Sequence, residues 1–180
     1  ALPNPCRKGV SALRWHPLCE EWVTGAPWRQ DRTYLPPPDH CPLCPTRPGH
    51  LETEIPEPDY HIAVFENRFP SFTGEQGRCE VVCYTPDHDS SLGEQSVEHI
   101  KDLIEVWRDR TEELGRVRNV RYVYIFENRG EAIGVTLSHP HGQIYAFPFV
   151  PPVLQHELRA HARHRRSTGR CIYCDVLDGE

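Results

Sequence analysis

The stretch Ser138-His139-Pro140-His141-Gly142-Gln143 determines how the rest of the chain is interpreted. In an extended strand its two imidazoles, two residues apart, project from the same side, and Pro140 between them restricts the backbone. Gly142 lets a bulky group such as a substrate approach the backbone, and the amide of Gln143 can donate or accept hydrogen bonds. The stretch indicates an imidazole nucleophile for attack on a phosphate, with ordinary surface histidines or two metal ligands as alternatives.

Composition and charge exclude several classes of protein. The 180 residues suffice for a domain with a real core, and the net charge of −6 argues against a general binder of nucleic acid or anionic membranes. The sequence shows neither an apolar run of membrane-spanning length nor a signal peptide, so we expect a cytoplasmic protein. It contains no methionine, so we expect a processed chain or part of a longer one.

The eight cysteines are arranged for metal or redox chemistry rather than for a disulfide framework. Four of them form two C-x-x-C pairs, Cys41/Cys44 and Cys171/Cys174, in a chain without a secretion signal. Prolines crowd residues 36–58 around the first pair, which predicts an extended, turn-rich segment there.

Hydrophobic periodicity predicts an α+β fold. Apolar and β-branched segments predict strands over residues 21–24, 61–67, 78–84 and 120–128, and another strand runs from the two histidines to residue 147. A long helix is expected from an N-cap at Ser96 to Gly115, and a polar helix over 153–166. The apolar face of the long helix comprises Val97, Ile100, Leu103, Ile104, Trp107 and Leu114. Its solvated face comprises Glu98, Lys101, Asp102, Glu105 and Arg108. Antiparallel strands crossed by one helix are typical of α+β proteins.

Cys41, Cys44 and His88, with either His139 or His141, form a candidate Cys₂His₂ metal site. Two thiolates two residues apart in a tight turn can bind one ion, and a closed set of sulfur and imidazole ligands favours structural zinc. If His139 is the ligand, His141 is left to act as a nucleophile. A neutral imidazole can attack the α-phosphorus of a nucleotide and form a nucleotidyl-histidine.

Further motifs accompany the double-histidine stretch: Cys41-Pro42-Leu43-Cys44, Phe65-Glu66-Asn67-Arg68-Phe69, Thr85-Pro86-Asp87-His88 and Glu127-Asn128-Arg129-Gly130. Together, from Arg14 to Cys174, they closely resemble the galactose-1-phosphate uridylyltransferase family of the histidine-triad superfamily. The resemblance implies a zinc-stapled, histidine-triad-like antiparallel sheet packed with one long helix. It also implies transfer of UMP between UDP-glucose and galactose 1-phosphate, a step of galactose metabolism in the Leloir pathway.

The resemblance also implies roles for individual residues. His141 is the nucleophile that becomes uridylylated, and Gln143 hydrogen-bonds the uridylyl phosphate. The zinc ligands are Cys41, Cys44, His88 and His139. The substrate-binding residues are Arg29, Arg32, Asn67, Asn128, Thr136 and Gln143, of which the two asparagines contact the nucleotide and the arginines and Thr136 lie near the phosphates.

Members of this family consist of two related halves, and this chain resembles the first. Residues 1–170 are therefore expected to form the N-terminal histidine-triad-like domain, and 171–180 to begin a truncated second half. Glu157 stands where some members place a ligand of a second metal, iron or zinc, but the other ligands belong to the second half, so we expect no second metal here. The full-length enzyme is expected to be a homodimer.

Two other functions stay open at this stage. One is a nucleoside-diphosphate-sugar or dinucleotide phosphorylase of the same superfamily, which would form the same nucleotidyl-histidine and use phosphate as acceptor. The other is a zinc-stapled binding or dimerisation module without catalysis. The retention of Asn67, Asn128 and Gln143 beside His141 argues against the latter, because a scaffold does not need these side chains.

Overall fold

The computed structural model describes residues 12–16, 21–25, 40–49, 52–74, 77–133 and 135–179. The chain divides into two units, Ala1–Pro148 and Phe149–Glu180, which are described separately. The sequence-based limits of 1–170 and 171–180 for two related halves stay a prediction. Among the described residues, no helix combines the length and apolar character that a bilayer crossing requires.

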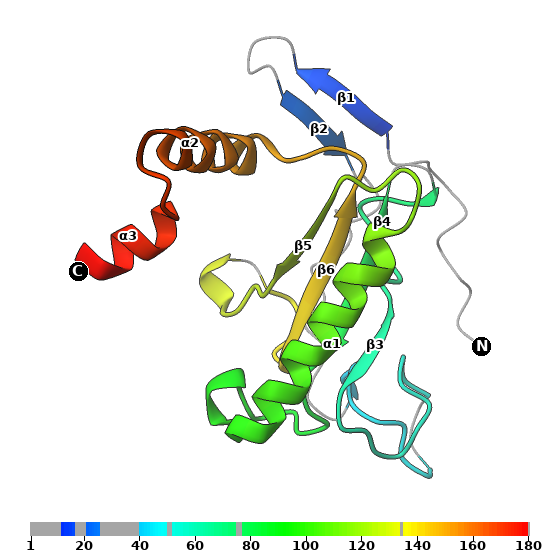
Figure 1. Ribbon diagram of the computed structural model, residues 1–180. Helices are drawn as coiled ribbons and strands as arrows, with labels where there is room; N and C mark the ends of the chain where they lie inside the picture. Colours follow the sequence, from blue (N-terminus) through cyan, green and yellow to red (C-terminus); the bar gives the residue numbers. More distant parts are fainter. Residues whose placement is uncertain are drawn as a thin grey trace. The chain divides into compact units, whose positions relative to one another are not determined.

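The first unit is built on a four-stranded antiparallel sheet (Figure 1). Its strands, in spatial order, are β3 (Ala63–Glu66), β4 (Arg78–Cys83), β6 (His141–Phe147) and β5 (Tyr122–Phe126). A separate antiparallel pair comprises β1 (Ala12–His16) and β2 (Glu21–Gly25). Two short 3₁₀ helices, η5 (Leu92–Glu94) and η6 (Glu131–Ile133), lie in the connections. The predicted strands of the large sheet are present, each shorter than expected at one or both ends.

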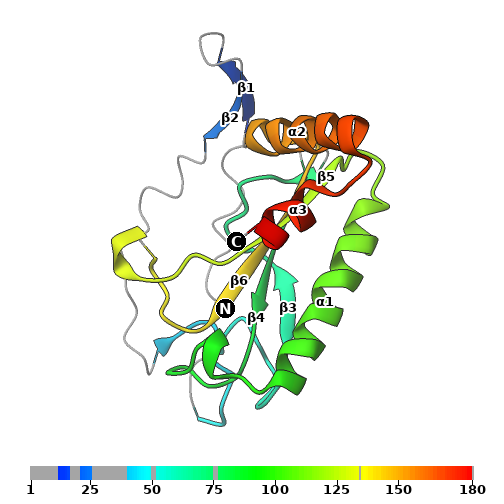
Figure 2. The same cartoon turned by 60° about the vertical axis from the view of Figure 1, so that its left-hand side comes forward.

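Helix α1 (Val97–Gly115) lies along one face of this sheet (Figures 1 and 2). The hydroxyl of Ser96 accepts a hydrogen bond from the backbone N–H of His99, which confirms the predicted N-cap. Leu103 and Leu114 are buried in one core cluster with Val82, Ile144 and Ala146 of the sheet and with Tyr84, which follows β4. The helix therefore covers the sheet as the periodicity indicated.

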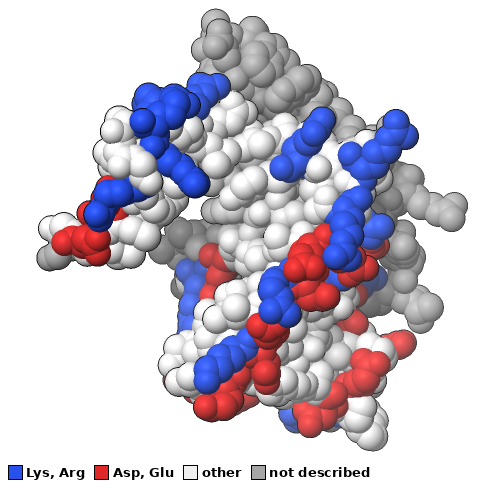
Figure 3. Space-filling model, in the orientation of Figure 1, with Lys and Arg blue, Asp and Glu red and all other residues white. Residues whose placement is uncertain are grey.

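One detail of the predicted helix is wrong. Val97 and Ile104 are 64% and 50% exposed, so the buried stripe is narrower than the apolar pattern. The predicted end of the helix is confirmed, because Gly115 is its last residue and Arg116 follows as the C-cap in a right-handed conformation. The predicted solvated face is confirmed, because Glu98, Lys101, Asp102, Glu105 and Arg108 are all exposed. Figure 3 shows charges of both signs alternating along this helix.

Strand β6 separates the two faces of the sheet by strict alternation. Gly142, Ile144 and Ala146 are buried on the helix side, whereas His141, Gln143, Tyr145 and Phe147 are half-buried on the other side. A second core cluster of Cys41, Leu43, Ile55, Val81 and Cys83 lies on that other side. The helix stabilises one face of the sheet, and β6 presents the polar side chains of His141 and Gln143 on the opposite face.

The second unit is a pair of helices, α2 (Pro152–Thr168) and α3 (Ile172–Gly179). Gly169 ends α2 in the left-handed conformation, with φ 73°. His164 Nε2 lies 2.6 Å from Asp175 Oδ2, which connects the two helices. The predicted polar helix over 153–166 is confirmed.

A buried carboxylate connects α1 to the sheet and yields a first prediction. Glu80 of β4 is 5% exposed and accepts hydrogen bonds from Arg110 Nε at 2.9 Å and Nη2 at 2.6 Å. Arg110→Ala leaves this carboxylate buried without a counter-charge, so we expect the free energy of unfolding to fall by about 3 kcal/mol in urea denaturation.

The matched control is Arg108→Ala on the same helix. Arg108 pairs with Glu105 within α1 and its side chain is 66% exposed, so we expect a loss of about 0.5 kcal/mol or less. Equal losses in the two variants would show that the link to Glu80 contributes nothing special to stability.

Candidate functional site

Four potential ligands from three segments meet on the face of the sheet opposite α1. Cys41 and Cys44 belong to the turn before the sheet, His88 follows β4, and His139 precedes β6. One ligand atom from each lies within 4.8 Å of all the others. Cys44 Sγ is 3.4 Å from His88 Nδ1 and 3.5 Å from His139 Nδ1. Tetrahedral coordination at zinc bond lengths separates neighbouring ligand atoms by about 3.3–3.8 Å, so the group could hold a metal ion.

The outer nitrogens of both histidines are held by hydrogen bonds. His139 Nε2 lies 2.9 Å from the carbonyl oxygen of Thr85 and 2.9 Å from the hydroxyl of Tyr60, which itself donates to the same carbonyl at 2.6 Å. His88 Nε2 lies 3.0 Å from Ser138 Oγ. Because a carbonyl can only accept, Nε2 of His139 carries the hydrogen and Nδ1 turns its lone pair toward the cysteines. Such outer partners fix the tautomer and orientation of metal-binding imidazoles.

Burial shifts the pKa values of two of the four potential ligands, and both shifts bear on the binding of a positive ion. Burial lowers the pKa of His139 to about 4, so its imidazole is in the neutral, ligating form at neutral pH. Burial, reinforced by the neighbouring Cys41, raises the pKa of the Cys44 thiol to about 12. Two adjacent thiolates are therefore unfavourable here unless a positive ion compensates them. A metal that displaces the thiol protons would supply this compensation.

His141 is oriented by the residue that contributes to the metal group. Its Nδ1 lies 2.7 Å from the backbone carbonyl oxygen of His139, so Nδ1–H donates and the lone pair of the neutral ring is on Nε2. The His139 ring thus faces the cysteines while its carbonyl fixes the tautomer of His141. An imidazole held in one tautomer is prepared for nucleophilic attack through the other nitrogen.

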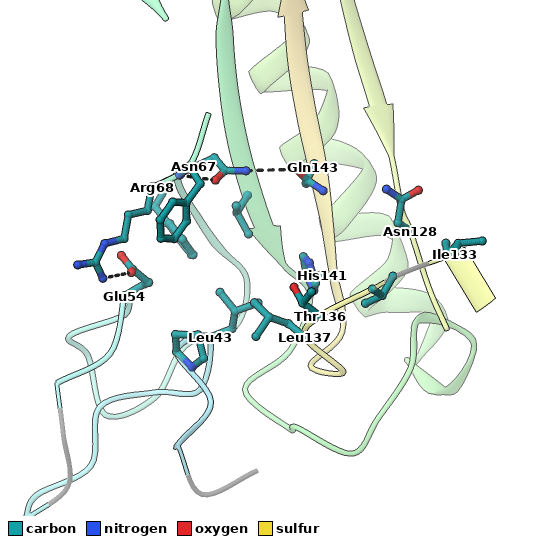
Figure 4. A pocket seen from close by; sticks show the side chains of 15 residues that line it. Leu43, Glu54, Asn67, Arg68, Asn128, Ile133, Thr136, Leu137, His141 and Gln143 are labelled. Atoms are coloured by element: carbon teal, nitrogen blue, oxygen red, sulfur yellow. Dashed lines mark hydrogen bonds and ion pairs between the residues drawn. The ribbon is translucent and has the colours of Figure 1, made fainter. Parts of the chain in front are cut away.

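A cavity of about 340 Å³ lies beside His141 (Figure 4). Four of the predicted site residues, Asn67, Asn128, Thr136 and Gln143, line it with His141. Apolar side chains also line it, from residues 41–44, from the sheet and the turn after β3, and from the segment before β6. They are Pro42, Leu43, Phe65, Phe69, Val81, Ile133, Val135 and Leu137. Apolar walls with a few converging polar groups are typical of sites for small organic ligands.

Two predicted site residues lie outside the described residues, and a third residue considered as a metal ligand belongs to the second unit. Arg29 and Arg32 belong to the segment that the structure does not describe. Glu157 is exposed on α2 in the second unit. The structure thus brings together the metal group, His141 and four of the predicted substrate-contacting residues.

Sequence patterns missed several residues of this site. Glu54 and Arg68 form an ion pair of 2.8 Å in the cavity wall, and Tyr60 supports His139. Arg68 follows Asn67 at the end of β3, so its position beside the cavity could have been noticed. Glu54 and Tyr60 lie in a proline-rich segment without periodicity, where no signal indicates the direction of a side chain.

Gly142 permits a close contact, but with the core instead of a substrate. A Cβ at this position would overlap the hydroxyl of Tyr84 and lie 3.1 Å from the carbonyl oxygen of Phe126. Tyr84 is 1% exposed. The expectation that Gly142 makes room for the substrate is wrong because even-numbered residues of β6 face the helix side of the sheet.

Comparisons with known proteins give a consistent set of similarities. Residues 72–151 match the family model described as "Galactose-1-phosphate uridyl transferase, N-terminal domain". Over 95% of its length the chain is 49% identical to galactose-1-phosphate uridylyltransferase of Streptomyces lividans, of which it covers 48%. It is 40% identical to the Thermotoga maritima protein of the same name, over 93% of the chain and 56% of that protein.

A solved structure and a more distant relative extend the comparison. The solved "Structure of uridylyltransferase" superposes with a TM-score of 0.72 at 29% identity, covering 93% of this chain and 56% of that one. ADP-glucose phosphorylase of Arabidopsis thaliana is 26% identical over 91% of the chain and 56% of that protein. The chain spans about half the length of the curated relatives that it matches.

The metal group yields a second prediction. Cys41→Ser and His139→Ala each remove one ligand, so we expect the metal content, measured by elemental analysis, to fall by about one equivalent per chain and the Tm to fall with it. Cys79→Ser is the control, because Cys79 is a buried thiol of β4 outside the group. Full metal content in the ligand variants would disprove this coordination.

A third prediction concerns the close contact between Gly142 of β6 and Tyr84 on the helix side of the sheet. Gly142→Ala forces a methyl group against Tyr84, and we expect the free energy of unfolding to fall by about 1–3 kcal/mol. Adding Tyr84→Phe should recover part of this loss by removing the oxygen. Gly115→Ala is the control, since a Cβ there meets nothing within 4 Å; equal stability of the two alanine variants in urea would refute the contact.

Proposed function

We propose that this chain, which is similar to the N-terminal domain of galactose-1-phosphate uridylyltransferases, carries the nucleophile of a nucleotidyltransferase. The enzyme would move UMP between UDP-glucose and galactose 1-phosphate. The observation that carries this proposal is the hydrogen bond from His141 Nδ1–H to the His139 carbonyl, which leaves the lone pair of His141 on Nε2 beside the cavity.

The reaction would proceed in two displacements at one phosphorus atom. Nε2 of His141 attacks the α-phosphorus of UDP-glucose, a P–N bond forms, and the P–O bond to glucose 1-phosphate breaks with the electron pair leaving on oxygen. A phosphate oxygen of galactose 1-phosphate then attacks the uridylyl-histidine, the P–N bond breaks, and UDP-galactose leaves. A covalent intermediate of this kind divides one difficult transfer into two easier steps.

The lining of the cavity supports this assignment of roles. Gln143 would donate from its NH₂ group to the phosphoryl oxygens, and Thr136 and the arginines Arg29 and Arg32 would lie near the phosphates. Asn67 and Asn128 would contact the nucleoside, whose base has apolar surface to match Leu43, Phe65 and Val81. A neutral donor aimed at an anionic oxygen stabilises the charge of the transition state.

We assign zinc to the group of Cys41, Cys44, His88 and His139. Two thiolates and two imidazoles form a closed soft-ligand set without an open position, which favours structural Zn²⁺. The ion would hold the segment before β6 in place and so support His141. We assign no second metal to Glu157, because the other expected ligands of that metal belong to the second half of the enzymes in this family.

The complete enzyme would act as a cytoplasmic homodimer on UDP-glucose and galactose 1-phosphate, with neither nucleic acid nor membrane as a partner. The net charge of −6 supports the exclusion of nucleic acid. Because the chain spans about half the length of its relatives, full turnover is assigned to the complete enzyme and the covalent half-reaction to this part.

A phosphorylase of nucleoside-diphosphate sugars is the second candidate. The similarity to ADP-glucose phosphorylase favours it, although at 26% identity this relative is more distant than the uridylyltransferases. Both enzymes would use the same nucleophile, so the acceptor and the base discriminate between them. Phosphate-dependent consumption of ADP-glucose, with no UMP adduct from UDP-glucose, would support the phosphorylase.

The fourth prediction tests the nucleophile. Mixing the metal-loaded protein with UDP-glucose should add the mass of one UMP group, seen by intact mass spectrometry. His141→Ala should abolish the adduct while the metal content stays, because its side chain lies outside the metal group. His139→Ala should lose metal and adduct together.

His61→Ala is the matched control for a histidine outside the cavity. His61 is exposed and pairs with Asp102 on α1, so this variant should label like the wild type. An adduct that persists in His141→Ala would refute the assignment of the nucleophile, and no adduct on the complete wild-type enzyme would refute the transferase.

A further inference from the structure

We infer that Asn67 is a positioning residue, which fixes the amide of Gln143 in the single orientation that turns its NH₂ group away from Asn67 and toward the reacting phosphate. The orientation itself is independent of any function. Its catalytic consequence rests on the proposed nucleotidyl transfer.

Asn67 is itself held in one orientation by two backbone contacts. Its N–H donates to the carbonyl oxygen of Cys79 at 2.8 Å, one residue beyond the end of β3. Its side-chain Oδ1 accepts a hydrogen bond of 2.9 Å from the backbone N–H of Phe69, as in an Asx turn. Because a backbone N–H can only donate, the atom facing Phe69 must be the oxygen, and the NH₂ group must face the other way.

The NH₂ group of Asn67 reaches Gln143, 76 residues further along the chain. Asn67 Nδ2 donates to Gln143 Oε1 at 3.2 Å, as Figure 4 shows. Since an NH₂ group only donates, the group of Gln143 that faces it must be the carbonyl oxygen. The backbone of Gln143 is fixed on both sides, opposite Val81 of β4 and Phe126 of β5. The NH₂ group of Gln143 is therefore the part of the amide left for a ligand.

The chemistry of phosphoryl transfer makes this orientation matter. Phosphoryl oxygens are anionic acceptors, so an NH₂ group attracts them and a carbonyl oxygen repels them. The two orientations of a glutamine amide have nearly the same shape, and packing alone cannot select between them. Asn67 selects the donating orientation before the substrate arrives, and a donor fixed in advance needs no reorganisation in the transition state.

Asn67→Asp tests this role with almost no change in shape. The aspartate can still accept from Phe69, but it offers Gln143 an acceptor in place of the donor, so the Gln143 amide must turn over and present its oxygen to the phosphate. We expect the single-turnover rate of UMP labelling to fall about 100-fold, the usual effect of losing one such donor. The Kd for UDP-glucose, measured by calorimetry on the metal-loaded protein, should change less than the rate.

A double-mutant cycle separates this role from a direct one. The labelling rate is compared at saturating UDP-glucose, where the proposed contact of Asn67 with the nucleoside no longer contributes through binding. If Asn67 orients Gln143, then Asn67→Asp should slow labelling no further in a Gln143→Ala background. Asn128→Asp places the same charge in the cavity, and among the described residues Asn128 forms no hydrogen bond with Gln143, so its effect should multiply with that of Gln143→Ala. Multiplying effects for Asn67→Asp as well would overturn the proposal and leave the transferase intact.

A measurement that needs no turnover tests the orientation directly. In ¹⁵N-labelled protein, Asn67→Asp should slow hydrogen exchange of the Gln143 side-chain NH₂ group, because this group now donates to the carboxylate. Asn128→Asp should leave that exchange unchanged. Unchanged exchange in Asn67→Asp would overturn the proposal even if labelling fails in every variant, and slowed exchange without labelling would refute only the proposed function.

Discussion

One residue, His139, connects the candidate metal site with the candidate nucleophile. The ring of His139 faces two thiols, and its backbone carbonyl accepts the hydrogen of His141 Nδ1. A displacement of the His139 backbone would therefore disturb both the position of its ring and the carbonyl that orients His141. Tyr60 and Thr85 hold the far side of the His139 ring, so the position of the candidate nucleophile depends on contacts from segments far apart in the sequence.

The two faces of the sheet have different roles: one packs against α1 in the core, and the other carries the residues of the candidate site. Alternation along β6 directs Ile144 and Ala146 to the core under α1 and directs His141 and Gln143 to the cavity. The helix side can be packed tightly, to the point that Gly142 has no room for a side chain beside Tyr84. On the other side, the described residues leave a cavity of about 340 Å³ beside the second core cluster. The tightly packed face under α1 thus fixes the backbone of β6, whose other face carries the side chains that line the cavity.

The sequence predicted features that repeat regularly or depend on few residues, and missed those that depend on distant partners. The long helix followed from its period, but the period does not reveal how wide a stripe the sheet covers, so Val97 and Ile104 were misplaced. Metal-ligand chemistry and spacing identified Cys41, Cys44 and His88, but spacing alone left His139 and His141 as alternatives until the family resemblance separated them. No local sequence pattern predicts that Glu80 pairs with Arg110, because the two residues come together only when α1 packs on the folded sheet.

The span of the metal group has a consequence for biosynthesis. Its ligands are spread so that Cys44 and His88 are 44 residues apart, and Cys44 and His139 are 95 residues apart. A growing chain is made from its N-terminus, so on the ribosome the two thiols emerge long before their last imidazole partner. The full set of four ligands is complete only after β4, α1 and β5 have been synthesised, because His139 follows all three. If the group holds a metal ion, as proposed, capture of that ion is therefore a late event in the maturation of the chain.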